Sequence, residues 1–171
     1  MNHLVIAPIL LPLLAGLVLL FLRQGRPLKR GVSITAVLAL VGLALILVNT
    51  VSSGDYLVYT LGNWPAPYGI VLVADRLAAW MVLITALLAL FALLYASRGT
   101  DRTGRHFHVL FLLQLFGLNG AFLTGDLFNL FVFFEILLLA SYGLLLHGGG
   151  RLRTRAGLHF VVINLAGSTL F

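Results

Sequence analysis

One carboxylate lies where a charge is costly. Glu135 stands in the middle of residues 131–139, whose other members are all apolar. At 1.5 Å per helical residue it lies about 13 Å past Asp126, close to the middle of a hydrocarbon layer about 30 Å thick. A carboxylate at that depth must face the bundle interior, pair with a cation or water, or stay protonated. Glu135 is therefore the candidate proton-transfer residue, and a structural carboxyl hydrogen-bonded between helices is the alternative.

Three further residues are candidates for a proton path or for its support. Asp126 follows Gly125 between two apolar runs, and a helix-capping role explains both residues, although a carboxylate there would also attract cations. Tyr142 lies seven residues after Glu135 and returns to the same helix face, where packing between helices is an equal explanation. His159 is a candidate because histidine is a common proton carrier, but it stands close to several arginines, as interface histidines commonly do.

Other site chemistry is poorly supported. The chain has no cysteine, which excludes disulfides and thiolate ligands. His106 and His108 have a spacing that fits a solvated loop better than a metal site. The glycines at 148–150 are followed by an arginine-rich linker, which is unlike a nucleotide-binding loop. We expect no metal, no cofactor and no enzyme acting alone.

Several polar or helix-breaking residues inside apolar runs have structural explanations. Gln114, Asn119 and Asn164 are amides that we expect to form hydrogen bonds between helices. Pro8 and Pro12 lie inside the first apolar run and predict a kink, which membrane helices tolerate when neighbours satisfy the freed carbonyls.

The elements that must position these residues are membrane-spanning helices. Of the 171 residues, 61% are hydrophobic and 9% are charged, and the mean hydropathy is +1.08, which is outside the range of soluble domains. Runs long enough to cross a bilayer are residues 4–22, 31–51, 77–97, 107–124 and 127–146. A sixth begins near Gly157 and is still apolar at Phe171. The sequence predicts an all-α polytopic transmembrane helical bundle, a single domain over 1–171, with five full spans and an incomplete sixth.

The positive charges indicate the orientation. Ten of the eleven Lys and Arg residues lie in short gaps between apolar runs, the exception being Arg76. Since such charges accumulate in cytoplasmic loops, the N-terminus is expected outside and the basic loops inside. This distribution has no basic stripe with interleaved aromatics, so nucleic-acid binding is disfavoured.

One external loop, about 52–74, has structure of its own. Two short apolar runs, 56–61 and 69–73, flank the turn-rich residues 62–67. This pattern predicts a small β-hairpin.

The sequence resembles a known transporter family. The segment TGDLFNLFVFFEILLLASYGLL at 124–145 is similar to the D subunit of the Mrp-type multisubunit cation/proton antiporters. So are MNHLVIAPILLPLL at 1–14, GNWPAPYGI at 62–70 and ADRL at 74–77. The resemblance runs over the whole chain and implies about the first third of such a protein, a fragment that we expect to be inactive alone.

The resemblance implies a function for Glu135. In this family, which is related to the proton-pumping membrane subunits of complex I, a glutamate at the matching position acts in proton transfer with a lysine on a later helix. The only lysine here is Lys29, in a loop, so that partner is missing. The implied activity is exchange of sodium, potassium or lithium ions for protons, in a complex with other membrane subunits in a bacterial inner membrane.

Two alternatives stay open. The first is a proton-pumping arm of a complex I-like oxidoreductase or a membrane-bound hydrogenase. The second is a purely structural membrane scaffold.

Overall fold

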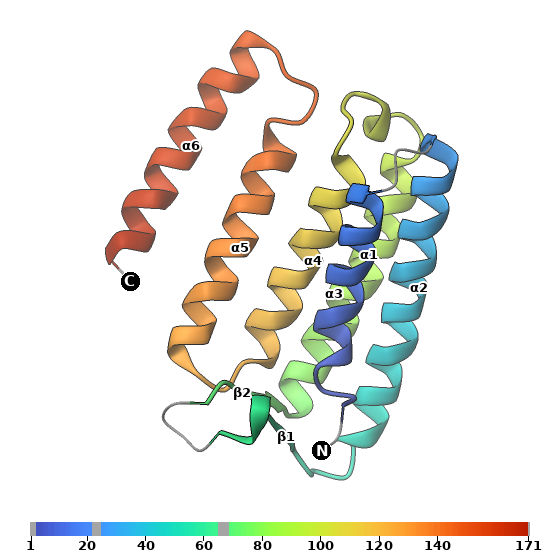
Figure 1. Ribbon diagram of the computed structural model, residues 1–171, viewed down its shortest axis with the longest axis vertical. Helices are drawn as coiled ribbons and strands as arrows, with labels where there is room; N and C mark the ends of the chain where they lie inside the picture. Colours follow the sequence, from blue (N-terminus) through green and yellow to red (C-terminus); the bar gives the residue numbers. More distant parts are fainter. Residues whose placement is uncertain (1–2, 22–24, 65–68, 171) are drawn as a thin grey trace.

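The computed structural model describes residues 3–21, 25–64 and 69–170, and six α-helices account for most of them. The helices are α1 (Ala7–Phe21), α2 (Arg26–Thr50), α3 (Arg76–Ala96), α4 (Phe107–Leu123), α5 (Leu127–Leu145) and α6 (Arg151–Leu170). They run side by side along the long axis of the molecule (Figure 1). The resulting architecture is a helical bundle, as the sequence predicts.

Each helix of the bundle packs chiefly against one or two others. α2 packs on α3, α1 packs on α4, and α5 packs on the other side of α4. α6 lies outermost and packs chiefly against α5 (Figure 1). The buried apolar side chains form two clusters, mainly from the first four helices, one including Ala44, Leu47 and Leu123 and the other including Val37, Leu93 and Leu112. α5 and α6 therefore have fewer buried side chains than the first four helices.

Three helices are long and apolar enough to cross a membrane: α2, α3 and α5. α1 and α4 are shorter apolar helices of 15 and 17 residues. The first run was expected to be helical from residue 4, but α1 begins only at Ala7. Pro8 lies in the first turn, where its missing N–H costs nothing, so only Pro12 stands inside the helix. The last residue of that expected run, Leu22, lies outside the described residues.

α6 begins earlier than the apolar run does. Its first residue is Arg151, whereas hydropathy alone places the sixth segment from about Gly157. Arginine and threonine carry no apolar signal, and yet arginine is a good helix former. The three glycines before α6 have positive φ angles, between 65° and 102°, and they separate it from α5.

The predicted hairpin is present. Strands β1 (Leu57–Thr60) and β2 (Val71–Ala74) pair antiparallel, with Leu57 opposite Ala74 and Thr60 opposite Val71. A short 3-10 helix, η1 (Leu61–Asn63), follows β1 and includes the start of the predicted turn at 62–67, of which residues 65–67 lie outside the described residues. The fold is thus helical with one small sheet, which lies at one end of the bundle (Figure 1).

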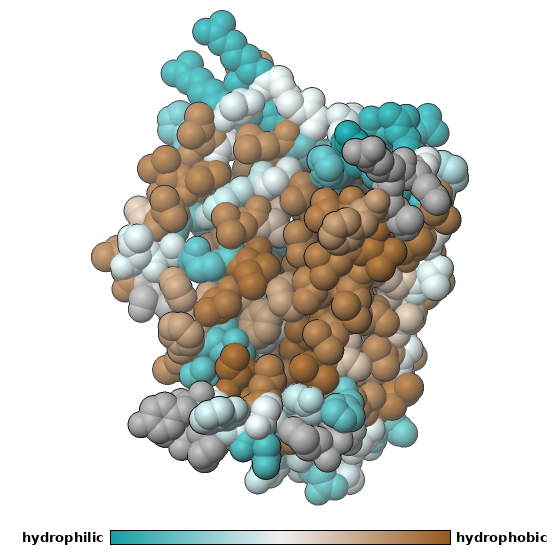
Figure 2. Space-filling model, viewed as in Figure 1, coloured by the Kyte–Doolittle hydropathy of each residue, from teal (hydrophilic) through white to brown (hydrophobic). Residues whose placement is uncertain are grey.

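The two ends of the bundle differ in character. The starts of α2, α4 and α6, which carry or follow the basic segments, share the end opposite the hairpin (Figure 1). The visible face between the ends is largely apolar, and polar residues gather toward the ends (Figure 2). Many large apolar side chains on this bundle are exposed, such as Phe91 and Ile163. A belt of this kind is typical of a protein that contacts lipid or other apolar subunits.

Candidate functional site

The start of α5 is fixed from two sides. Asp126 is its N-cap residue, and its carboxylate accepts hydrogen bonds from the backbone N–H groups of Phe128 (3.1 Å) and Asn129 (3.2 Å). The preceding Gly125 donates its N–H to the Val71 carbonyl of β2 at 2.9 Å. The capping explanation of Asp126 is confirmed, and the hairpin anchors the helix that carries Glu135.

Close packing on α4 sets the rotation of α5. A Cβ added to Gly117 of α4 would lie 2.9 Å from the backbone nitrogen of Leu137, and one added to Gly120 would lie 2.2 Å from the Phe133 ring. Phe133 and Leu137 are one helical turn apart and face α4. Glu135 lies between them in sequence, about 200° round the helix from either. The close approach at these two glycines therefore directs Glu135 away from α4.

Glu135 lines a groove between α5 and α6. The groove has a volume of about 510 Å³, and α6 contributes Asn164 and Ser168 to it, together with apolar residues. The Oε1 atom of Glu135 is buried and has no hydrogen-bond partner among the described residues. A buried carboxyl oxygen without a donor can accept a hydrogen bond from water, bind a cation or bind a proton.

The polar groups of α6 in this groove are bonded within their own helix. Asn164 Nδ2 donates to the Phe160 carbonyl at 2.8 Å, and Ser168 Oγ donates to the Leu165 carbonyl at 3.3 Å. The expected interhelical hydrogen bond of Asn164 is therefore not formed here. Within the described part of the chain, Glu135 has no ion-pair partner.

The other three candidate residues do not line this groove. Tyr142 packs the edge of its ring against Phe160, with ring centroids 5.9 Å apart, which matches its packing explanation. His159 is exposed, and its Nδ1 lies 2.8 Å from the Arg155 carbonyl. Asp126 lies at the N-terminal end of α5. The structure thus places Glu135 alone of the four in the groove.

Asn119 makes the interhelical hydrogen bond expected of it. It is fully buried, and its Nδ2 donates to the Pro8 carbonyl of α1 at 2.8 Å. That carbonyl lacks its usual helical partner because residue 12 is a proline. Gln114 is half-buried, and its Oε1 has no partner among the described residues.

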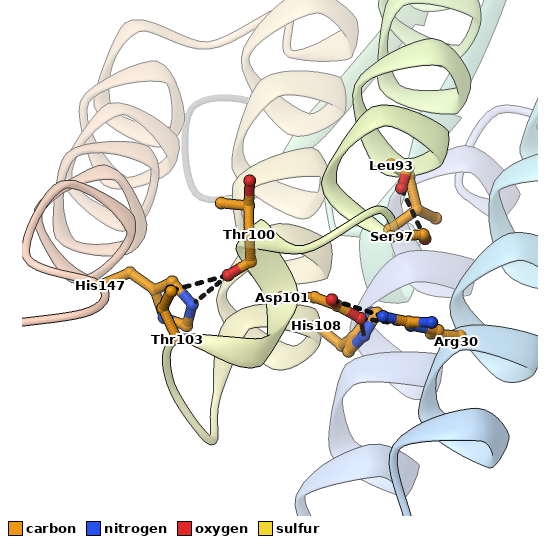
Figure 3. Close-up of polar contacts among 8 residues, drawn as sticks. All are labelled: Arg30, Leu93, Ser97, Thr100, Asp101, Thr103, His108 and His147. Atoms are coloured by element: carbon orange, nitrogen blue, oxygen red, sulfur yellow. Dashed lines mark hydrogen bonds and ion pairs between the residues drawn. The ribbon is translucent and has the colours of Figure 1, made fainter.

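A buried ionic cluster lies at the basic end of the bundle, and sequence patterns did not reveal it. Asp101, in the 3-10 helix η2 (Thr100–Arg102), is 3% exposed. Arg30 of α2 donates two hydrogen bonds to it, one from Nε to Oδ2 and one from Nη2 to Oδ1 at 2.7 Å (Figure 3). The hydrogen bond from the Arg30 guanidinium lowers the pKa of the Asp101 carboxyl.

His108 belongs to the same cluster. It was expected in a solvated loop, and this was wrong: it is 5% exposed in the first turn of α4, with Nε2 3.5 Å from Asp101 Oδ2. His106 is exposed, as expected. The one sequence signal of the cluster is a lone acid, Asp101, in a basic segment, and pattern alone does not show which cation it meets. In the described ranges, no group of three metal-ligating side chains occurs.

His147, which follows α5, ties that helix to the same end. It is buried, and its Nε2 lies 3.1 Å from the Thr100 carbonyl (Figure 3). Arg153 of α6 donates a hydrogen bond to the His147 carbonyl. The connection between α3 and α4 therefore holds α2, α4 and the α5–α6 junction together.

Comparisons with known proteins identify the relatives of this chain. No family model matches it. It is 52% identical over its full length to the D subunit of a probable K(+)/H(+) antiporter of Rhizobium meliloti, and 43% identical to the D subunit of the Na(+)/H(+) antiporter of Alkalihalophilus pseudofirmus. It spans 33% and 35% of the lengths of these relatives.

Solved structures agree with the sequence relatives. A chain of the Mrp complex from Dietzia sp. matches with a TM-score of 0.91 and 32% identity, over 99% of this chain and 33% of that one. A chain of an archaeal membrane-bound sulfane sulfur reductase, a respiratory membrane complex, matches with a TM-score of 0.92 and 28% identity, over 98% and 35%. The predicted resemblance is confirmed: in sequence and in fold, this chain is similar to about one third of the D subunit of an Mrp-type antiporter.

Proposed function

We propose that this chain is part of a membrane subunit of a multisubunit antiporter, which exchanges monovalent cations for protons, and that Glu135 carries the proton. The observation that carries the proposal is the carboxyl of Glu135, half-way along an apolar helix, with one buried oxygen that lacks a hydrogen-bond donor among the described residues. Such a group binds a proton or a cation more readily than it stays unpaired. The similarity to antiporter D subunits supports exchange as the reaction.

The α5–α6 groove is suited to form one side of a proton path, with the other side supplied by further parts of a complex. Its α5–α6 walls are mostly apolar, and the α6 side adds two polar residues, Asn164 and Ser168. The only lysine, Lys29, lies in the first turn of α2, whereas Glu135 lies half-way along α5. We infer that the cationic partner of Glu135 comes from outside these 171 residues, and that other membrane subunits, lipid, protons and monovalent cations are the partners.

The proposed topology has the basic end of the bundle in the cytoplasm. Five spans and a sixth segment, with the N-terminus and the hairpin outside, give one transmembrane domain in a bacterial cytoplasmic membrane. The gathering of the basic segments at one end and of the hairpin at the other supports this orientation (Figure 1).

The test measures cation-dependent proton flux in everted vesicles that contain the full-length subunit in its complete complex. Glu135→Gln keeps the shape of the side chain and removes its titration, so flux should fall at least about a hundredfold, the usual contribution of a proton-transfer group. Asp55→Asn, an exposed loop carboxylate that accepts a hydrogen bond from Ser53 at 2.9 Å, is the matched control. Unchanged flux in a normally assembled Glu135→Gln complex would reduce Glu135 to a packing role.

A second candidate is a proton-translocating arm of a redox complex. The similarity to a chain of the archaeal respiratory complex favours it. The same vesicles distinguish the two functions. An antiporter moves protons when a sodium or potassium gradient is applied without any electron donor, whereas a redox pump requires the donor and responds little to the cation gradient.

A further inference from the structure

A pocket at the basic end of the bundle has an excess of unpaired positive charge. It has a volume of about 490 Å³ and lies between the start of α2 and the connection from α3 to α4. Four cationic side chains line it: Arg26, Lys29, Arg102 and Arg105. None of the four has a hydrogen-bond or ion-pair partner within the described residues.

The single carboxylate in this pocket does not balance these charges. Asp101 lines the pocket, but both of its oxygens already accept hydrogen bonds from Arg30. His108 forms part of the same lining, is nine-tenths buried, and has an Nδ1 atom without a hydrogen-bond partner among the described residues. The pocket therefore presents several donors and at least three net positive charges to whatever occupies it. An anion with several acceptor oxygens, such as a phosphate group, matches this chemistry.

An apolar groove starts at the same end of α2 as this pocket. It lies between α1 and α2 and has a volume of about 610 Å³. On α2 it extends from Leu28, the neighbour of Lys29 in the chain, to Ala39, a distance of about 16 Å along the helix. On α1 it is lined by Leu11, Leu14 and Ala15. A cationic pocket at a polar helix end and an apolar groove directed inward match the two ends of one amphiphile.

We propose that these features bind an anionic phospholipid, with the phosphate between Lys29, Arg102 and Arg105 and an acyl chain along the α1–α2 groove. Cationic pockets between membrane helices on the cytoplasmic side commonly hold anionic head groups. A free phosphate would need the pocket but not the groove, which is why the groove favours a lipid. The bound lipid would join α1, α2 and the α3–α4 connection, at the end of the bundle where the Arg30–Asp101 pair already joins α2 to that connection. This inference rests on the proposed orientation, with the basic end of the bundle at the cytoplasmic surface, and not on ion exchange.

The test counts phospholipids retained by the purified complex with the full-length subunit, using native mass spectrometry after exchange with phosphatidylglycerol or with phosphatidylcholine of the same chains. The wild type should retain phosphatidylglycerol in preference. Each cation near a membrane surface contributes about a fivefold factor, so Lys29→Gln with Arg102→Gln should weaken retention about 25-fold. The matched control is Arg151→Gln with Arg155→Gln, two exposed arginines at the same end that do not line the pocket.

Two further variants distinguish the contribution of the charges from that of the acyl chain and from an effect of misfolding. Lys29→Arg with Arg102→Lys keeps the charge and should keep the lipid. Ala39→Phe fills the groove at an exposed position and should displace the lipid while leaving the basic pocket intact. This variant tests the proposal if the glutamine variant does not assemble.

Equal retention of the two lipids, or equal loss in the pocket variant and its control, would overturn the proposal. Inorganic phosphate serves as the chain-free probe. If it competes fully and Ala39→Phe has no effect, the pocket is a site for a soluble anion, and the assignment to lipid is wrong.

Discussion

The hydrogen bond from Asn119 to Pro8 offers a sharp test of how this bundle tolerates a proline. In an α-helix the carbonyl of residue 8 accepts the N–H of residue 12, and Pro12 has none. Asn119 Nδ2, from α4, occupies that place at 2.8 Å. Replacing Asn119 by leucine keeps the number of side-chain heavy atoms and leaves the Pro8 carbonyl without a donor in a buried site. We expect a loss of stability from this change.

The magnitude follows from the burial of both partners. An orphaned buried carbonyl costs about 1–3 kcal/mol, but hydrogen bonds between membrane helices average about 0.6 kcal/mol and reach about 1.7 in double-mutant cycles. We therefore expect Asn119→Leu to cost about 1–2 kcal/mol. In a Pro12→Ala background the new N–H satisfies Pro8, so the same change should cost about 1 kcal/mol less.

The assay is a four-member cycle of the full-length subunit in mixed micelles, with unfolding followed by tryptophan fluorescence during titration with a denaturing detergent. Asn164→Leu is the matched control, because that amide donates to the Phe160 carbonyl of its own helix. It should show no coupling with Pro12. Equal costs of Asn119→Leu in the two backgrounds would refute the reasoning.

Three further predictions use the same unfolding assay. Gly117→Ala should cost about 1–3 kcal/mol of stability, because its Cβ would meet the Leu137 backbone at 2.9 Å. The control Gly42→Ala, whose Cβ would have no atom within 4 Å, should be neutral or stabilising. Similar effects at both sites would contradict close packing of α4 on α5. Asp126→Ala should cost about 1 kcal/mol by removing the α5 cap, and Asp126→Asn should cost less, while no loss in either would exclude the cap as a stabilising feature. Because the pKa of Asp101 is lowered in the folded state, its carboxylate stabilises the fold fully above its unfolded pKa of about 3.9, and this stabilisation is lost as pH falls through the lower folded pKa. Asp101→Asn should therefore make the free energy of unfolding less dependent on pH in that acidic range. An unchanged pH profile would argue against the ion pair.

The local features of this chain could be predicted from its sequence because each depends on near neighbours. Apolar runs of helical length predicted the helices, and two short runs around a turn predicted the hairpin. Gly125 followed by Asp126 predicted a cap, because a capping side chain reaches N–H groups only two or three residues away. The depth of Glu135 also followed from counting along one helix.

Helix ends were less predictable, because hydropathy is not helix propensity. α6 starts in an arginine-rich segment that carries no apolar signal, and α1 starts just before Pro8, which suits a first turn.

The remaining features were decided by the tertiary structure, since they join residues far apart in the chain. Arg30 meets Asp101 across 71 positions, and Asn119 meets Pro8 across 111, and no local pattern specifies such pairs. The direction of Glu135 is of the same kind, because it depends on which face of α5 packs against the glycines of α4. Sequence alone determined that a carboxyl lies in the middle of an apolar helix. Packing between helices determined that it faces the α5–α6 groove, because the rotation of a helix about its axis is fixed only by its neighbours.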